Sequence, residues 1–560
     1  MLLIKKKNNN PLLRFVAYAI VLITLFISLI FPLVIRFVGI FAIPTATCAI
    51  QTADSNGLLS NPIPESHRYW QGVTKLEVDF PFPSILLSIF ISITGISNEW
   101  LIFIPITGLA NIACFVLAKR VLCGQNSLKG YGLLLSALFY AFTTFNSLST
   151  NYVGRATLGV TFLTYFLLCY ILFLYNHLSG HRECTRAWFV MLSLFTLATG
   201  YTYYTSTLAI VAITSLTIVV LSIIALLSEK PIHPLGLTLT VIAMCLLIWN
   251  PFINTMEGKL DLNSFITNIV QYMTSMLGIE AGQSGSMPLQ WKLIDIDFPT
   301  RVIGGWLIDA IKLSSIVAVV LALFRYSPKK FKTETPKIVW LFSLVVLLSG
   351  LSELTYLFLV PLGAIRFLST YGLIVLFFGL NNFIEKRDRS KHGNFWKKAL
   401  LLLLVIIVSL GCLGSLRAAW DYSPVKPFAY YDVKPLTDFL VSYSSCENPV
   451  TITGDIDYIG NIFFITFSQG NFSSIIPEPL GKDALTLSTS LLASEIGNNS
   501  TPFIVSMNSR NIRYLLIING TKSTWGDPWS YGVTLRNTYL LKTLFSLVYN
   551  DGRSQFFEVT

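Results

Sequence analysis

The acidic and basic side chains best placed for chemistry gather in one segment, from about Pro44 to Trp100. Asp54 stands early in this segment, and the pair His67-Arg68 follows it, next to Tyr69 and Trp70. A carboxylate in this position can act as a general base toward a hydroxyl group, and an Arg with a His can hold a phosphate. The same segment carries three rival bases, which are Glu65, Glu77 and Asp79.

The composition of the chain is that of a polytopic membrane protein. Of its 560 residues, 53% are hydrophobic and 12% are charged, whereas a soluble domain carries about 25% charged residues. The mean hydropathy is +0.64. So few charges cannot cover this much apolar surface in water, which excludes a soluble multidomain protein and a disordered chain. The net charge of +11 does not indicate nucleic-acid binding, because the basic residues fall in predicted cytoplasmic loops.

We predict about eleven transmembrane helices, since the bilayer core is about 30 Å thick and a spanning helix needs about 20 apolar residues. The predicted spans are 12–34, 101–118, 131–148, 156–177, 187–205, 207–228, 235–253, 303–324, 337–350, 366–384 and 398–416. The apolar run 84–98 is too short to span comfortably. It is predicted to be an interfacial or re-entrant helix at the outer side.

The basic residues orient the predicted spans. With a cytoplasmic N-terminus, nearly every dense Lys/Arg cluster lies on the inner side, including 325–337 and 386–398. The segment from about 418 to 560 is then outside. Four N-glycosylation sequons agree with this orientation, because all of them lie in that segment, at Asn471, Asn498, Asn499 and Asn519.

The outer tail, residues 418–560, is predicted to be an extracytoplasmic α/β domain that follows the transmembrane domain 1–417. It is predicted to pack over the membrane part rather than to act as an independent catalytic domain. Short β-like runs alternate with helix-like stretches. The β-like runs are 450–453, 514–518 and 556–559, and the helix-like stretches are 434–443 and 538–548. Cys48 and Cys446 both fall in outer segments, and a bridge between them is left open.

The order of these features resembles a known family. After one span comes the long outer loop with its early Asp, then Phe80-Pro-Phe-Pro83, then a helix ending in Thr94-Gly-Ile-Ser97. Further similar stretches are Tyr152-Val-Gly-Arg155, the Thr/Tyr-rich run 197–206 and Pro361-Leu-Gly-Ala-Ile-Arg366. Together they resemble the integral-membrane glycosyltransferases of the GT-C superfamily, especially their archaeal-type members. The resemblance implies transfer of a sugar from a polyprenyl (dolichyl) phosphate-linked donor to an acceptor on the outer face. It implies that Asp54 is the catalytic carboxylate.

The positions of the residues at the predicted outer interface suggest which of them bind donor and acceptor. A lipid phosphate needs a cation at the outer interface, and the candidates for this role are His67, Arg68, Arg155 and Arg366. Arginines at helix ends also snorkel to headgroups without a further function. The candidates for sugar or acceptor contacts are Tyr201, Tyr203 and Tyr204, which could equally form part of an aromatic belt. The sequence shows no metal-ligand cluster, so no cofactor is assigned and a divalent metal is left open.

Two other functions remain open at this point. A secondary transporter or lipid flippase would keep polar residues or broken helices at the bilayer midplane, whereas here the centres of the predicted spans are nearly free of charge. A non-catalytic membrane anchor of a surface assembly would explain the outer tail but not the long first loop. The expected partners are a polyprenyl-phosphate-linked sugar, membrane lipids and a glycan, protein or lipid acceptor.

Overall fold

The fold was analysed in a computed structural model of the chain, which is mostly helical. Apart from isolated residues, the structure describes 11–35, 42–55, 68–96, 98–105, 107–123, 131–146, 154–227, 234–251, 319–324, 343–345, 409–414, 429–444, 449–454, 456–470, 473–477, 512–518, 545–550 and 554–559. The four predicted spans between 303 and 416 lie almost entirely outside these residues.

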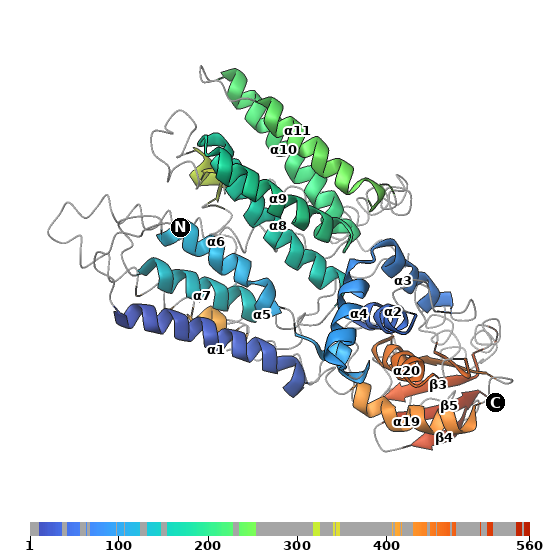
Figure 1. The fold of residues 1–560 in the computed structure, drawn as a ribbon. Helices are drawn as coiled ribbons and strands as arrows, with labels where there is room; N and C mark the ends of the chain where they lie inside the picture. The colour runs from blue at the N-terminus through green and yellow to red at the C-terminus, as the bar shows by residue number, and fades with distance from the viewer. Residues whose placement is uncertain are drawn as a thin grey trace, which may run out of the picture.

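The long apolar helices form two neighbouring groups. In Figure 1, α1, α5, α6 and α7 lie together, and α8 to α11 form a second group beside them. The long helices are α1 (Pro11–Ile35), α7 (Tyr131–Asn146), α8 (Arg155–Leu178), α9 (Arg182–Gly200), α10 (Tyr204–Leu227) and α11 (Pro234–Leu247). Among the described residues, three stretches are long and apolar enough to cross a bilayer, which are Pro11–Phe31, Thr157–Leu178 and Ser206–Ile223. They coincide with the predicted spans 12–34, 156–177 and 207–228.

Helix α8 lies in the interior of the helical bundle, whereas helix α1 lies at its periphery. Of the apolar stretch in α8, 82% is buried inside the protein, compared with 17% of the stretch in α1. Helix α1 therefore exposes most of its apolar side chains, as a helix in contact with lipid would. Close packing in the second group depends on small residues. A Cβ at Gly159 of α8 would come within 2.6 Å of Tyr203 Cβ, and one at Gly200 of α9 within 2.3 Å of Ile248 Cγ2.

The predicted span 101–118 is not one helix. The chain forms η1 (Asn98–Phe103), α5 (Thr107–Ala110) and α6 (Ile112–Cys123) there instead. Pro105 accounts for the first break, because proline lacks the N–H that a helix interior needs and disfavours helical backbone at the residue before it. The spanning helix predicted from hydropathy alone is therefore wrong for this stretch.

The segment predicted to be outside contains three described helices ahead of η1, which are α2 (Ala42–Asp54), α3 (Arg68–Asp79) and α4 (Phe82–Thr94). Helix α4 has 13 residues, and at about 1.5 Å per residue it is about 20 Å long, less than the bilayer core. It ends at Gly95, whose φ of 63° is left-handed and whose N–H donates to Ile91 O. The structure confirms a short helix here, while its position relative to the bilayer stays a prediction.

The side chains of α4 are distributed in the opposite way to those of a helix in water. Ser84 and Ser88 are buried against the protein, while Ile89 and Ile93 are exposed. An outward apolar face on a helix at the edge of an apolar bundle is the pattern expected for contact with lipid.

The C-terminal part of the chain forms a five-stranded sheet with two helices. Its elements are α19 (Ala429–Tyr443), β1 (Val450–Gly454), α20 (Ile456–Ser468), β2 (Ile475–Pro477), β3 (Tyr514–Ile518), β4 (Phe545–Asn550) and β5 (Ser554–Val559). The strand order is β2-β1-β3-β5-β4. Strands β2, β1 and β3 are parallel, and β5 runs antiparallel to both β3 and β4.

One predicted helix of this part is wrong where the structure describes it. Residues 545–548 of the helix-like stretch 538–548 belong to strand β4. This strand pairs with β5 from Phe545↔Val559 to Asn550↔Gln555, with an irregularity between Leu547 and Tyr549. The partner strand follows within a few residues, so ladder hydrogen bonds outweigh the local helical pattern.

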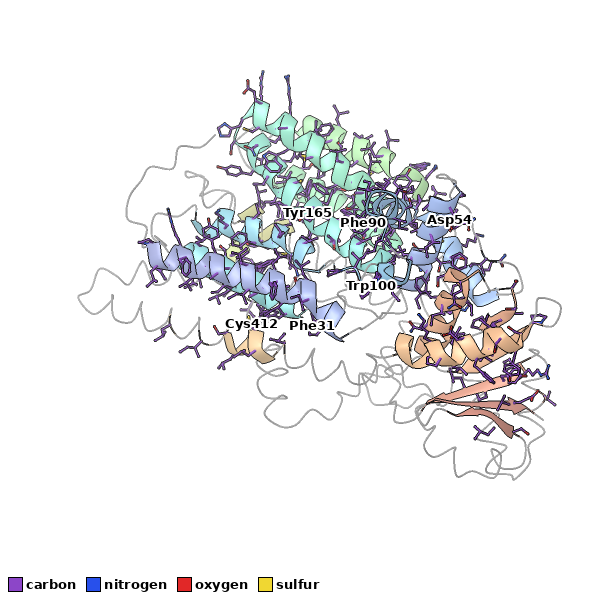
Figure 2. All side chains as sticks on the ribbon, turned by 60° about the horizontal axis from the view of Figure 1, so that its bottom comes forward. Phe31, Asp54, Phe90, Trp100, Tyr165 and Cys412 are labelled. Carbon is purple, nitrogen blue, oxygen red and sulfur yellow. The ribbon has the colours of Figure 1, made fainter. Side chains whose placement is uncertain are left out.

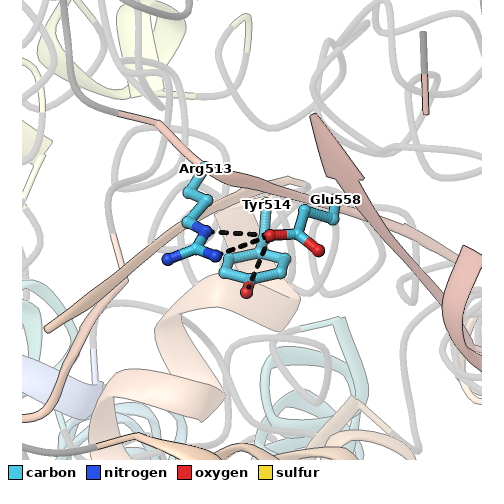
Figure 3. A network of polar contacts seen from close by, with 3 residues as sticks. All are labelled: Arg513, Tyr514 and Glu558. Carbon is cyan, nitrogen blue, oxygen red and sulfur yellow. Dashed lines mark hydrogen bonds and ion pairs between the residues drawn. The ribbon is translucent and has the colours of Figure 1, made fainter. Parts of the chain in front are cut away.

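A polar network marks the register between β3 and β5 (Figure 3). Arg513 donates from Nε and Nη2 to Glu558 Oε1, at 2.9 and 2.8 Å, and its guanidinium lies over the Tyr514 ring. The Tyr514 hydroxyl donates to the same oxygen at 3.4 Å, and Tyr514 and Glu558 are register partners in the sheet. The Arg513 side chain is 61% exposed, so water screens the pair and it contributes at most about 1 kcal/mol to stability.

Candidate functional site

Four helices meet around the carboxylate of Glu77. On α3, Trp70, Thr74 and Glu77 are all buried. Their spacing of four and three residues places them on one face of the helix. Since the other described residues of α3 include the exposed Lys75, the helix is amphipathic and turns this face inward. Glu77 is therefore buried because it lies on the same face of α3 as Trp70 and Thr74.

Glu77 faces the first residue of α8. Its Oε1 lies 3.7 Å from Arg155 Nε, and the side chains of Glu77 and Arg155 are 1% and 12% exposed. The Ser84 hydroxyl of α4 donates to Glu77 Oε2 at 3.4 Å. The pair thus joins the outer segment to the end of a long apolar helix. Burial makes the pair costly unless its remaining atoms also find partners.

Burial also changes the protonation of Glu77. It raises the pKa of this carboxyl above the ordinary value of 4.5, while the Arg155 charge and the hydroxyls of Thr45 and Ser84 oppose the shift. The Thr45 hydroxyl lies close enough to act on the carboxyl, but it forms no hydrogen bond of ordinary geometry with a described residue. A carboxyl in this setting takes up a proton more readily than one in water.

The pair leaves a polar atom unmatched. Arg155 Nη1 is buried and has no hydrogen-bond partner among the described residues. Buried polar atoms are nearly always hydrogen-bonded, so an unmatched one is a place where a ligand or water can bind. A guanidinium nitrogen donates only, and the group that satisfies it must offer an acceptor oxygen.

Cys48 closes the site on the α2 side. Its thiol is buried, and Sγ lies 3.9 Å from Thr74 O of α3. Burial and the nearby Glu77 carboxylate raise the pKa of this thiol, against the effect of Arg155. Cys48 is a free cysteine, so the structure shows no bridge at this position, and Cys446 lies outside the described residues. The neutral thiol acts as a small packing group between α2 and α3.

Asp54, the predicted base, is not part of the buried pair. It is the last residue of α2 and is exposed. Nine positions separate it from Thr45, which corresponds to about 14 Å along the helix axis. Figure 2 shows Asp54 well apart from Tyr165, which lies in the middle of α8. The Asp54 side chain is therefore exposed, whereas those of Glu77 and Arg155 are largely enclosed.

The predicted tyrosines lie close to the helices that form the pair. Tyr201 follows α9, and its carbonyl accepts the N–H of Phe82 at 3.1 Å, which ties this turn to the start of α4. Tyr203 packs against Gly159, one helical turn after Arg155 on α8. Tyr204 is the first residue of α10. The structure thus brings Tyr201 and Tyr203 to the elements that carry Ser84 and Arg155.

The remaining predicted site residues are not placed. Arg68 opens α3, and its side chain is not described. The others lie outside the described residues, and they are His67, Arg366, Asn471, Asn498, Asn499 and Asn519. Within the described part of the chain, no three His, Cys, Asp or Glu residues are grouped as a metal site would require.

Sequence reasoning underrated Glu77, which it named only as a rival base. The spacing of Trp70, Thr74 and Glu77 was the available signal, because it places a carboxylate on the same helix face as two residues suited to burial. Its pairing with Arg155 joins parts of the chain far apart in sequence, and a single sequence carries no signal for that contact.

The comparisons with known proteins give little guidance. No protein-family model matches the chain, and no curated protein sequence matches it. Among solved structures, the chain is similar to ArnT from Cupriavidus metallidurans, in its apo state with a TM-score of 0.46 and bound to undecaprenyl phosphate with a TM-score of 0.45. Each match has 12% sequence identity and covers 97% of both chains. A likeness of this strength does not assign the chain to a family, so its function has to be argued from its own residues.

Proposed function

We propose that the chain is a membrane glycosyltransferase that moves a sugar from a polyprenyl (dolichyl) phosphate-linked donor to an acceptor on the outer face of the membrane. The observation that carries the proposal is the enclosed Glu77–Arg155 pair at the first residue of α8, with Arg155 Nη1 unmatched. A lipid phosphate presents its oxygens where an apolar helix ends, and a guanidinium binds them as a charge-assisted pair. The class of donor comes from the sequence motifs of the outer loop.

Each residue has a distinct role in this proposal. Arg155 holds the phosphate, Glu77 orients the guanidinium through Nε, and Tyr201 and Tyr203 contact the sugar. His67, Arg68 and Arg366 are further candidates for the phosphate.

The reaction balances with Asp54 as the base. The Asp54 carboxylate takes the proton of the acceptor hydroxyl while that oxygen bonds to the anomeric carbon. The bond between the anomeric carbon and the phosphate oxygen breaks, and polyprenyl phosphate leaves. Arg155 stabilises the negative charge that grows on the leaving phosphate. The exposed position of Asp54 suits a group that meets an acceptor arriving from outside.

The two alternatives explain less of the structure. A transporter or flippase would need its ionisable groups near the middle of the membrane part, whereas the described buried pair lies at the end of α8. A non-catalytic anchor gives no reason to bury a carboxylate and a guanidinium whose partners are incomplete.

A transfer assay tests the proposal. The purified full chain in lipid nanodiscs is given a radiolabelled polyprenyl-phosphate hexose together with glycans, proteins or lipids taken from the outer face of the cell membrane. The label should pass from the donor to one of these acceptor fractions. If a panel of hexoses shows donor binding and no transfer, while vesicles show movement of the labelled lipid across the bilayer, the transporter function replaces this one.

The orientation of the chain is proposed with a cytoplasmic N-terminus and the C-terminal sheet outside, in the cell membrane. Cys184 tests it, because this cysteine is exposed in the first turn of α9, on the side predicted to be cytoplasmic. A membrane-impermeant maleimide should label Cys184 only after the cells are permeabilised, as measured by peptide mass spectrometry. Labelling of Cys184 in intact cells would show that the proposed orientation is wrong.

A further inference from the structure

The C-terminal sheet shares one hydrophobic core with the outer segment. Buried residues of α19, α20 and β1 pack in the same cluster as residues of α2 and η1. From the outer segment the cluster takes Ala42, Ile43, Ala46, Ile50, Ile63, Trp70, Leu101 and Ile102. In Figure 1, α20 lies between the sheet and α2, and the contacts between these elements agree. The C-terminal part is therefore fastened to the segment that carries the candidate site.

Trp70 makes the most specific contact in this shared core. Its ring stacks on Phe463 of α20, with centroids 4.5 Å apart and planes 7° from parallel. Its indole N–H donates to the carbonyl of Pro477, the last residue of β2, at 2.6 Å. A fully buried Trp with a ring contact and a satisfied N–H fixes its helix in both position and rotation.

Helix α3 connects this contact to the carboxylate. Trp70 and Glu77 lie seven residues apart, about two turns, on the same buried face. Between them, Thr74 contacts α2 through its carbonyl, which lies against the Cys48 thiol. A rotation or shift of α3 at Trp70 would therefore move Thr74 away from Cys48 and Glu77 away from Arg155.

We propose that Trp70 is a positioning residue, which uses the C-terminal sheet to hold α3 so that Glu77 stays against Arg155. The C-terminal part then acts as a structural element of the site, whatever it binds itself. The proposal rests on the proposed function only for its effect on lipid phosphate. Its structural part, the anchoring of α3, stands apart from any reaction.

The buried Cys48 thiol reports on this anchoring without any substrate. In the full-length protein in nanodiscs, below its melting temperature, Trp70→Ala should raise the rate of Cys48 modification by a small maleimide about tenfold, because the α2–α3 contact opens locally. Trp70→Phe keeps the ring stack and loses only the N–H, so its rate should lie within about threefold of the wild-type rate. Peptide mass spectrometry assigns the label to Cys48 rather than to another cysteine.

Leu440→Ala is the matched control. Leu440 is buried in the same core, on α19, which packs on α20 and β5. This variant should lower the melting temperature and leave Cys48 labelling within about twofold of wild type, since it opens a cavity on α19, whereas the Trp70 contacts are made by α20 and β2. If Trp70→Ala labels Cys48 at the wild-type rate, or if Leu440→Ala labels it as fast as Trp70→Ala, the anchoring role is wrong.

A binding measurement separates this proposal from the proposed function. The affinity for polyprenyl phosphate should fall in Trp70→Ala, recover in Trp70→Phe and stay unchanged in Leu440→Ala. If Cys48 labelling follows the expected order while no variant or wild type binds polyprenyl phosphate, the anchoring of α3 holds and the proposed function fails. If wild type binds and Trp70→Ala binds equally well despite faster labelling, Trp70 does not position the site.

Discussion

Asp54→Asn should lower the rate of sugar transfer by about 10²–10⁴-fold, the contribution that a positioned general base usually makes. The substitution keeps the size of the side chain and removes its ability to take the acceptor proton. Asp54 is exposed at the end of α2, so the change should cost little stability. Donor affinity should persist, because the proposal assigns the lipid phosphate to Arg155 and not to Asp54. Single-turnover transfer and donor binding, measured on the same preparation, separate the two effects.

Asp79→Asn and Glu77→Gln serve as comparisons for this result. Asp79 is half-buried at the end of α3, in the same predicted outer segment as Asp54. The proposal gives it no role in the reaction, so Asp79→Asn should leave the transfer rate within a few-fold of the wild-type rate. If Asp54→Asn transfers sugar at the normal rate and Glu77→Gln does not, the base is Glu77 and the assignment drawn from the outer-loop motifs is wrong. Normal transfer by all three variants would show that none of these carboxylates is the base.

The sequence predicted the long helices and several strands well, for a simple physical reason. Helices α1, α8 and α10 follow apolar runs long enough to cross a bilayer. Strands β1, β3 and β5 follow the short β-like runs at 450–453, 514–518 and 556–559. In both cases the local pattern and the tertiary environment favour the same structure. The exceptions arise where they differ, at Pro105, which divides an apolar run, and at Phe545–Asn550, where pairing with β5 decides the structure.

The candidate site was less predictable than the fold. Sequence reasoning named Arg155 and Glu77 separately but could not join them, because α3 and α8 meet only through tertiary packing. It predicted a folded domain 418–560 that packs over the membrane part, but gave no reason to expect that Trp70 would stack on Phe463. Contacts between segments distant in sequence depend on how the whole chain packs. The types and local spacing of residues do not predict such contacts individually.

Arg155→Ala should weaken the binding of polyprenyl phosphate by about tenfold to 100-fold, because a hydrogen bond to a charged group is worth about 1.5–3 kcal/mol. The protein should still fold, since burial lets the unpaired Glu77 carboxyl take up a proton. Arg155→Lys should restore only part of the affinity, because the ammonium keeps the charge without the fork of donors. Titration of nanodisc-embedded protein with the lipid gives both affinities.

Arg513→Ala is the matched control for the loss of one arginine. Arg513 is paired with Glu558 on the C-terminal sheet and is largely exposed. Its removal changes the net charge by the same amount as Arg155→Ala, so any effect of overall charge on lipid binding appears in both variants. Equal losses of affinity in the two variants would show that Arg155 holds no specific phosphate.

The Glu77 carboxyl should make this binding depend on pH. Burial raises its pKa. Above the raised pKa the carboxylate holds Nε of Arg155 and leaves Nη1 to the phosphate. Below it the carboxyl is neutral and orients the guanidinium less firmly, so affinity should rise as pH rises through the pKa of Glu77. The lipid phosphate loses its own second proton near pH 6, and its added negative charge acts in the same direction. Glu77→Gln isolates the carboxyl, because this variant keeps the phosphate titration and lacks the titrating group on the protein.

The pH dependence of protein stability reports on the titration of Glu77 without any ligand. A carboxyl whose pKa is raised by folding binds more protons in the folded state than in the unfolded state. Its contribution to the free energy of unfolding is fully present below the ordinary value of 4.5 and is lost as pH rises through the raised pKa. The melting temperature of wild type relative to Glu77→Gln should therefore decline over that window. A pH-independent difference, together with parallel affinity curves for the two proteins, would show that Glu77 does not titrate against Arg155.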